Sequence, residues 1–370
     1  MAGITEYLTE GSRIFFTGVK SKFKPKEYVG DANQICKQIV KECWNGKFFQ
    51  TSTTNFPQFW SRDFGWCTQS LMKLGYEQEV RQTLKYALNR FQDVGKITTT
   101  ITPNGKPYDF PTFAVDSIPW LIHSIKVSKF YYGNYKEFLN QQIQKLFDTA
   151  VSLKTGLVKQ DLHFSSMKDF AVRKSSCYDN CMLAMLAKDL EKMHGLINPF
   201  KDYDYEELLL KHFWNFEQGY FYDDSTKQDY IAGDANLFPF ALGIINDVDK
   251  LHSALEAIQA AGLDAPLPLK YTSGRSKVNF IMQEVFLRDY ESNSIWTHMG
   301  PLFIKLVKSA NKWQGEIYQK KYTEMIEKLM CYPEVLTMQG EGEEIEIKLF
   351  KTPFYTADRG MLWAANYLTL

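Results

Sequence analysis

Six short segments of the chain share one pattern, in which a polar or aromatic residue precedes a run of apolar residues. They are residues 60–66, 115–120, 178–183, 233–238, 295–300 and 357–363. The spacing between their polar residues varies from 53 residues, between Asp63 and Asp116, to 64 residues, between Asp234 and His298. A loose period of this length indicates one repeated supersecondary unit. We expect each segment to begin a buried helix with a polar residue at its N-terminal end, and these residues are Asp63, Asp116, Asp179, Asp234, His298 and Asp358.

A second set of helical patterns alternates with the first and is more amphipathic. These patterns cover about 31–45, 76–92, 134–153, 203–215, 250–262 and 314–330. Leu251, Leu255 and Ile258, for example, have the spacing of a helix with one exposed face. The first set is apolar nearly all round, as in residues 181–187. The first set therefore predicts inner, buried helices and the second set predicts outer, half-exposed ones.

The connections between the two sets are unequal in length. Each inner helix leads to the next outer helix through a brief link, whereas the return link is long, at about 46–60, 93–115, 154–177, 216–233, 263–295 and 331–356. Long loops in a compact domain are usually functional. All six should emerge on one face, around the N-terminal ends of the inner helices, where free N–H groups and the helix dipole favour anions and hydroxyl oxygens.

Twelve alternating helices in six hairpins predict an all-α fold, an (α/α)6 toroid that comprises residues 1–370 as a single catalytic domain. An open solenoid of stacked helix pairs is the alternative. Closure is favoured because there are six inner helices and they are apolar on all sides. Short β-hairpins are expected in the long loops, at 219–224 and at 335–349, where alternating segments flank a Gly-containing turn.

Composition and charge narrow the class of protein. The chain is 45% hydrophobic, and its 43 basic and 43 acidic residues form no basic stripe, which argues against a nucleic-acid partner. Glu6, Glu10 and Arg13 interrupt the N-terminal apolar stretch, unlike in a secretory signal. No apolar run reaches the ~18 residues of a membrane span. We therefore expect a cytoplasmic protein with no membrane partner.

The six cysteines are scattered, and most fall at core-like positions of helical patterns, as expected of reduced thiols. Cys177 and Cys181 lie four residues apart on one predicted helix, but no second Cys or His pair follows nearby. A zinc site is the less favoured interpretation of this pair. We expect no metal site and no required cofactor.

Acidic residues that converge at helix ends suit the hydrolysis of a glycosidic bond, which needs two facing carboxyls. Each of them has an alternative role as a helix N-cap. The repeat layout of the whole chain resembles that of the six-hairpin glycosidase superfamily, which contains glucoamylases, trehalases, processing α-glucosidases, glucosylglycerate hydrolases and alkaline/neutral invertases. This resemblance implies a glycoside hydrolase, usually an inverting one, and a small carbohydrate as the partner. A deep toroid pocket would suit exo attack on a small α-glucoside or an oligosaccharide end.

The segment Trp60-Ser61-Arg62-Asp63-Phe64 resembles the W-x-R-D or R-D-F element of glucoamylase-like and invertase-like members. The resemblance implies that Arg62 and Asp63 hold hydroxyls of the terminal sugar. A carboxylate and a guanidinium together offer acceptors and fork-shaped donors for such hydroxyls. A helix cap with a surface arginine is the alternative.

Residues 165–173, followed by Tyr178 and Asp179, are similar to a segment of processing-glucosidase relatives that carries the general acid. The resemblance implies that Asp169 is the acid, with Arg173 and Asp179 near the same sugar. The chain lacks the Gly-x-Asp-Asp motif of those relatives, so Asp161 and Asp179 remain alternative candidates for the general acid. Asp169 could also be a plain solvent-facing loop residue.

Family members place the second carboxyl in the loop before a segment that resembles residues 354–363. The candidates are Glu334, Glu341, Glu343, Glu344 and Glu346. Glu334 is preferred because it directly follows an outer helix and opens the predicted ribbon, whereas charges in the ribbon turn are usually solvated. Its implied role is general base on a water molecule.

Aromatic residues should complete the pocket, because sugar C–H faces stack on flat rings. The predicted sugar-binding residues are Trp60, Arg62, Asp63, Asp116, Trp120, Arg173, Asp179, Asp234, Trp296, His298 and Asp358. Large buried aromatics and a lone histidine also serve as ordinary core residues.

Three other functions compete with hydrolysis. A sugar epimerase on the same toroid needs histidines, and only His298 lies at a predicted helix end. A uronyl hydrolase would call for more basic helix ends than Arg62, Arg173 and Arg359 provide. A non-catalytic helical scaffold would expose polar inner helices. Phosphorolysis stays open, although no phosphate-cradling Gly-rich loop is evident.

Overall fold

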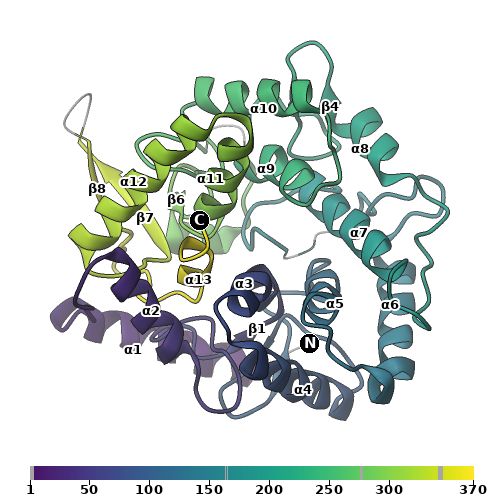
Figure 1. Ribbon diagram of the computed structural model, residues 1–370, viewed down its shortest axis with the longest axis horizontal. Coiled ribbons are helices and arrows are strands. Elements are labelled where there is room, and N and C mark those ends of the chain that lie inside the picture. The colour runs from purple at the N-terminus through teal and green to yellow at the C-terminus, as the bar shows by residue number, and fades with distance from the viewer. Residues whose placement is uncertain (1–3, 163, 165, 276–277, 341–344) are drawn as a thin grey trace.

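The computed structural model describes residues 4–162, 164, 166–275, 278–340 and 345–370, and its helices form an inner and an outer set (Figure 1). The inner helices are α3 (Ser61–Lys73), α5 (Ser117–Val127), α7 (Cys177–Leu190), α9 (Gly233–Ala241), α11 (Met299–Ala310) and α13 (Ala364–Tyr367). The outer helices are α2 (Ala32–Cys43), α4 (Glu77–Asp93), α6 (Lys136–Ala150), α8 (Tyr205–Phe213), α10 (Val248–Ala260) and α12 (Lys312–Leu329). The predicted helical class and the alternation of the two sets are confirmed.

Inner helices that follow one another in the chain contact each other, and the last helices also contact the first ones. Each inner helix contacts the next inner helix, and α13 also contacts α3. The outer helices α4, α6, α8, α10 and α12 each contact the inner helix that precedes them. The remaining inner helix, α13, instead packs against α2 from the other end of the sequence. The two ends of this array therefore lie side by side.

Burial distinguishes the two sets as the hydrophobic pattern predicts. In α7, every residue from Cys177 to Ala187 is buried, whereas in α10 only Ala254, Leu255 and Ile258 are buried. Inner helices also approach each other closely. A Cβ atom on Gly65 of α3 would lie 2.6 Å from the Cβ atom of Trp120 in α5. This distance is far shorter than any ordinary contact, so the close packing of α3 and α5 depends on the missing side chain.

Side-chain N-caps occur in both sets: Ser176 caps the inner helix α7, whereas the outer helices α4 and α6 have no side-chain cap. The outer helices α2, α8, α10 and α12 begin at Asp31, Asp204, Asp247 and Asn311, whose side chains accept a backbone N–H of the first turn. The inner helices α3, α5, α9 and α11 have no such cap. Asp116 occupies the N-cap position of α5 without making the capping bond. Its carboxylate is therefore available to other partners.

Short strands lie in the long loops. Strands β4 (Trp214–Asn215) and β5 (Tyr220–Phe221) pair antiparallel, as do β7 (Val335–Gln339) and β8 (Glu346–Leu349), which confirms the two predicted hairpins. Strand β6 (Ile295–Trp296) pairs with the other edge of β7, and β1 (Phe59–Trp60), β2 (Thr100–Ile101) and β3 (Pro107–Tyr108) form a further small sheet. Residues 341–344 of the predicted Gly turn lie outside the described residues. Pairing of Trp296 with Val335 brings Glu334 close to the start of α11.

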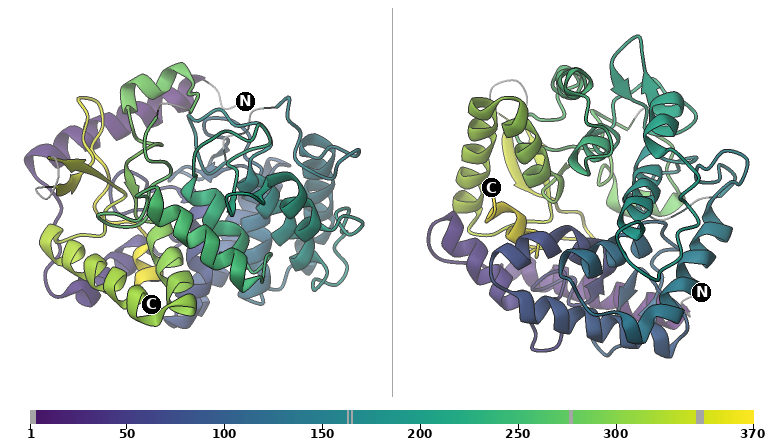
Figure 2. Two further views of the ribbon diagram at one scale, coloured as in Figure 1. Left: turned by 90° about the horizontal axis from the view of Figure 1, so that it is seen from above. Right: turned by 45° about the vertical axis from the view of Figure 1, so that its right-hand side comes forward.

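Two features were not predicted from the sequence. Helix α1 (Ile4–Phe23) precedes the alternating set and runs along the upper edge of the left view in Figure 2. Its Lys22 donates to the carbonyl oxygens of Thr352 and Pro353, at 3.1 and 3.2 Å, which ties it to the loop before α13. Helix α13 itself is only one turn long. No helix within the described ranges is long and apolar enough to cross a membrane.

Candidate active site

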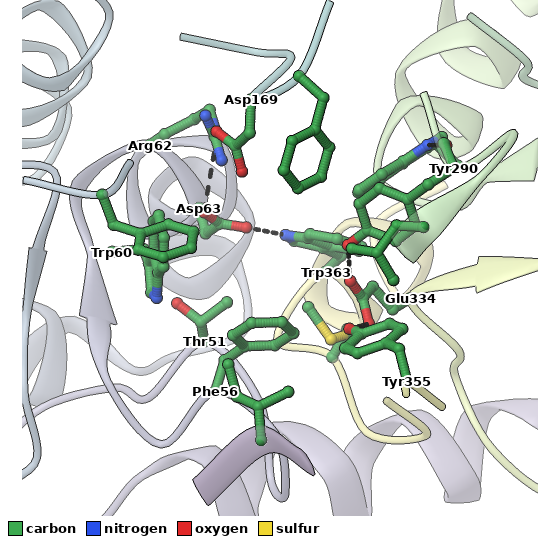
Figure 3. Close-up of a pocket in the computed structure, with 16 residues that line it drawn as sticks. Thr51, Phe56, Trp60, Arg62, Asp63, Asp169, Tyr290, Glu334, Tyr355 and Trp363 are labelled. Carbon is green, nitrogen blue, oxygen red and sulfur yellow. Dashed lines mark hydrogen bonds and ion pairs between the residues drawn. The ribbon is translucent and has the colours of Figure 1, made fainter. Parts of the chain in front are cut away.

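A pocket lies at the N-terminal end of α3. Figure 3 shows its side chains, which come from widely separated parts of the sequence. They are Ile14, Thr51, Phe56, Trp60, Arg62, Asp63, Phe110, Asp169, Phe170, Leu287, Tyr290, Trp296, Glu334, Tyr355, Met361 and Trp363. The two residues predicted as acid and base, Asp169 and Glu334, both line this pocket.

Arg62 and Asp63 occupy the first turn of α3, where the predicted sugar-gripping pair should be. Asp63 accepts a hydrogen bond from Nε1 of Trp363 at 2.9 Å, and its other oxygen lies 3.8 Å from Nε of Arg62. Burial raises the pKa of Asp63, and Arg62 opposes this effect. The guanidinium of Arg62 also lies 3.6 Å from Asp116 and donates to the carbonyl of Ser166. Asp63 is buried, and the side chain of Arg62 is 15% exposed, so the guanidinium lies mostly within the protein.

Asp116 lies behind Arg62, away from the pocket wall. One of its carboxylate oxygens accepts from the Tyr178 hydroxyl at 3.1 Å, and the other has no hydrogen-bond partner among the described residues. Burial raises the pKa of Asp116 to about 7, against the lowering effect of Arg62. The carboxyl is therefore poised to exchange a proton near neutral pH.

Asp169 lies in the loop between α6 and α7 and points toward Arg62 in Figure 3. The carboxylate of Glu291 holds this loop in place, because it accepts backbone N–H bonds from Asp169, Phe170 and Ala171 at 2.5, 2.8 and 2.8 Å. Burial and, after it, the charge of Asp169 raise the pKa of Glu291 to about 7. Glu291 was not predicted as part of the site, since Arg288-Asp289-Tyr290-Glu291 has the pattern of an ordinary charged surface stretch.

Glu334 directly precedes β7 and is 2% exposed. Both of its oxygens are occupied: the hydroxyls of Tyr290 and Tyr355 donate to them, as does the backbone N–H of Asp358 at 3.0 Å. Burial raises the pKa of Glu334 to about 7, and these three donors work in the opposite direction. The donors orient the carboxylate and stabilise its ionised form.

Aromatic side chains surround these carboxyls. Trp60, Trp296 and Trp363 line the pocket together with Tyr290 and Tyr355. Nε1 of Trp296 donates to the carbonyl of Tyr290 at 2.6 Å, whereas Nε1 of Trp60 has no partner among the described residues. Flat rings beside buried carboxyls and an unpaired N–H suit a ligand with C–H faces and hydroxyls.

Several predicted residues lie near the pocket without lining it. Arg173 bonds to Asp234 at 2.9 Å, and Lys168 lies 3.2 Å from the same carboxylate. Both cations also approach Asp223, at 3.5 and 3.4 Å. All four side chains are buried, so they form an ion cluster inside the protein. Asp179 lies beside this cluster, and the charge of Arg173 offsets part of the rise in the pKa of Asp179 that burial causes.

His298 and Trp120 are packed in the centre of the helix array. The ring of His298 stacks on Trp66, with centroids 4.4 Å apart, and Nδ1 has no partner among the described residues. Burial holds the pKa of His298 well below its usual range. Nε1 of Trp120 donates to the Tyr178 hydroxyl at 3.0 Å. The structure thus places both side chains behind the pocket wall.

Asp358 ties two loops together. One of its oxygens accepts from the hydroxyls of Ser52 and Thr54, at 2.5 and 2.7 Å, and from the backbone N–H of Asn55, at 2.5 Å. The other accepts from the N–H of Gly360 at 2.8 Å. These bonds occupy both oxygens of Asp358 within the protein.

The alternative carboxyls are placed away from the pocket or lie outside the described residues. Asp161 and Glu346 are exposed and do not line the pocket. Glu341, Glu343 and Glu344 lie outside the described residues. Within the described ranges, no group of three or more His, Cys, Asp or Glu side chains is arranged to hold a metal ion, and Cys177 and Cys181 are buried free thiols.

Comparison with known proteins shows a shared fold. No protein-family model matches the sequence, and a search of curated proteins finds no significant match. Among solved structures, a rhamnosidase from Klebsiella oxytoca with rhamnose bound aligns at a TM-score of 0.60 and 8% identity, over 93% of this chain and 64% of that one. The chain therefore spans about two thirds of the length of that enzyme.

Two further structures align over nearly their whole length. A wild-type glycosidase has a TM-score of 0.62 at 10% identity, covering 97% of this chain and 96% of that one. A GH63 mannosylglycerate hydrolase from Thermus thermophilus, in complex with Tris and D-glycerate, has a TM-score of 0.56 at 10% identity, covering 92% of this chain and 100% of that one. The chain therefore shares the overall fold of these solved structures.

Proposed function

We propose that the chain is a glycoside hydrolase built as one closed (α/α)6 toroid. The cyclic order of inner-helix contacts, in which α13 returns to α3, supports closure. The observation that carries the function is the presence of Asp169 and Glu334 in one aromatic-walled pocket. Two carboxyls in a shared pocket are the requirement for cleaving a glycosidic bond.

Asp169 is proposed as the general acid and Glu334 as the general base. The bond between the anomeric carbon and the leaving oxygen breaks as Asp169 gives its proton to that oxygen. Glu334 takes a proton from the water whose oxygen bonds to the anomeric carbon, so the configuration inverts. Glu334 suits the base role because Tyr290, Tyr355 and the Asp358 N–H all donate to it.

Arg62 and Asp63 are proposed to hold the terminal sugar. Among the described residues that line the pocket, they are the only arginine and acidic residue that are neighbours in the sequence. Exo attack is proposed as the mode of action, and a small α-glucoside or an oligosaccharide end is the proposed substrate. Structural neighbours hold rhamnose in one case and glucose in another, which agrees with a sugar-binding site. No histidine appears among the described lining residues, which disfavours an epimerase.

The test is release of free sugar from a panel of α- and β-glycosides by the parent, Asp169→Asn and Glu334→Gln. Each substitution should lower kcat by at least about a hundredfold. Asp161→Asn and Glu346→Gln are matched controls, because both carboxyls are exposed and lie off the pocket. Unchanged rates in both pocket variants would refute the assigned site, and no release of sugar from any glycoside would refute the proposed function.

A further inference from the structure

The pocket is lined by a few charged side chains and by a larger number of apolar ones. Its charged lining residues are Arg62, Asp63, Asp169 and Glu334, as far as the described residues extend. The other hydroxyl and indole donors are mostly committed: the hydroxyls of Tyr290 and Tyr355 bond to Glu334, and the indoles of Trp296 and Trp363 bond to Tyr290 and Asp63. Of the described lining residues, only Thr51 and Nε1 of Trp60 add further polar side-chain atoms.

The remaining lining side chains are apolar: Ile14, Phe56, Phe110, Phe170, Leu287 and Met361. Aromatic rings alone would fit a second sugar, but aliphatic side chains such as Ile14, Leu287 and Met361 offer nothing to sugar hydroxyls. A hydroxyl that is moved from water to such a wall loses its hydrogen bonds without replacement. This part of the pocket therefore disfavours a polar occupant.

The apolar character continues outward on the elements that carry these walls. Helix α1, which supplies Ile14, also exposes Phe15, and the short helix η2 (Met282–Leu287), which supplies Leu287, exposes Phe286. The exposed ring of Phe286 packs edge-on against exposed Phe354, with centroids 5.5 Å apart. Exposed apolar side chains that are grouped beside a pocket usually mark a binding surface.

A negatively charged leaving group is also disfavoured. Arg62 is the one cation among the described lining residues, and it already faces Asp63 and Asp116 at 3.8 and 3.6 Å. A carboxylate in the outer part of the pocket would therefore meet no free positive charge among those residues.

We propose that the leaving group is an apolar alcohol, alkyl or aryl, so that the substrates are glycosides of hydrophobic aglycones. This inference rests on the proposed hydrolase function. The sugar occupies the side with Arg62 and Asp63, and the aglycone lies against Ile14, Leu287 and Met361. Hydrolysis releases the free sugar and the alcohol, whose oxygen takes the proton of Asp169.

The test compares methyl, benzyl and n-octyl glycosides of whichever sugar is released, together with a disaccharide of the same sugar. The three alcohols have similar acidity, so differences in kcat/KM report binding of the aglycone and not the chemistry of the leaving group. Because each buried methylene contributes about 0.8 kcal/mol, the octyl or benzyl glycoside should exceed the methyl glycoside at least about tenfold. Preference for octyl indicates a lipid-like chain, and preference for benzyl alone indicates a compact aryl group.

Leu287→Asn should reduce the preference for octyl over methyl glycoside about tenfold, because it places an amide in the apolar wall. Leu153→Asn is the matched control, since Leu153 is 74% exposed and does not line the pocket. Faster cleavage of the disaccharide than of the octyl glycoside would overturn the inference and leave the hydrolase intact. If no glycoside is cleaved, the proposed function fails, and the inference is then tested by calorimetry. Binding of an octyl glycoside by the parent that is lost in Leu287→Asn supports the inference. Absence of binding to the parent overturns it.

Discussion

The protonation of Glu334 depends on a balance between burial and hydrogen bonding. Burial favours the neutral acid, whereas Tyr290, Tyr355 and the N–H of Asp358 favour the carboxylate. The resulting pKa of about 7 places the change of charge within the physiological range. A base with this pKa should limit activity on the acidic side of the pH profile.

Tyr355→Phe removes one of the donors that lower the pKa of Glu334. The pKa should therefore rise further above 7, and the acidic limb of the kcat/KM profile should move to higher pH by about one unit. Tyr205→Phe is the control, because its hydroxyl bonds to the carbonyl of Gly156 outside the pocket. An acidic limb that stays in place in Tyr355→Phe would show that Glu334 is not the base.

Glu291→Gln should lower kcat about ten- to hundredfold. The amide of glutamine has only one acceptor oxygen, so it cannot accept all three backbone N–H bonds that the carboxylate accepts. The loop that carries Asp169 should therefore shift. Glu284→Gln is the matched control: Glu284 is also buried and accepts from Arg275 and from the N–H of Asp289, away from Asp169. Thermal unfolding and steady-state kinetics of both variants separate the two effects. Equal loss of kcat in both would indicate a general structural role.

The sequence was more informative for some site residues than for others. Arg62 and Asp63 lie in the first turn of α3, and Glu334 lies between α12 and β7, so their places along the chain could be read from the local pattern. Asp234 and Asp358 have the same local pattern, but their partners Lys168 and Ser52 come from distant loops. Loop conformation depends on such long-range contacts, which hydrophobic periodicity does not encode.

At the scale of elements, the alternation of inner and outer helices could be predicted from the sequence. Inner helices such as α7 bury residues on all sides and are largely apolar, whereas outer helices such as α10 bury one face and are amphipathic. Helix α1 lies outside that alternation, and its position depends on contacts such as those of Lys22 with the loop before α13. The brief α13 was expected as a full inner helix. The segment before α13 is held largely by loop contacts, and α13 adds only a single turn at its end. The repeat pattern therefore predicted a longer helix than the structure contains.

Gly65→Ala should destabilise the protein by about 1–3 kcal/mol, because the new methyl group would collide with Trp120 and separate α3 from α5. Gly11→Ala in α1 is the control, since a Cβ atom added there would have no neighbouring atom within 4 Å and alanine favours helix. Urea unfolding of both variants measures the difference. Equal stability of Gly65→Ala and the parent would show that α3 and α5 can separate at no cost.

At the scale of the whole molecule, a group of buried carboxyls links stability to pH. Burial raises the pKa of each member of this group, which comprises Asp63, Asp116, Asp179, Glu291 and Glu334. The folded protein therefore holds protons that the unfolded chain releases, and for Asp116, Glu291 and Glu334 this happens between an ordinary carboxyl pKa near 4 and a folded pKa of about 7. Their contribution to stability is complete below that window and is lost as pH rises through it.

The free energy of unfolding should accordingly fall by at least about 2 kcal/mol between pH 5.5 and 7.5, since each such carboxyl contributes about 1.4 kcal/mol per pH unit. His298, with its lowered pKa, acts in the opposite direction up to its usual value and offsets one of these groups. Denaturant unfolding at the two pH values measures the change. Stability that rises over this interval would contradict the raised pKa values of these carboxyls.

The pairing of α13 with α2, α3 and α11 has a consequence for biosynthesis. Asp63 leaves the ribosome early, but Glu334, Tyr355 and Trp363 follow about three hundred residues later. Until then, the nascent chain has the pocket residues of α3 without those of the C-terminal loops, and a row of inner helices whose first and last members lack their final neighbour. The apolar inner helices of such a polypeptide are incompletely covered, and the pocket is complete only after translation has passed residue 363.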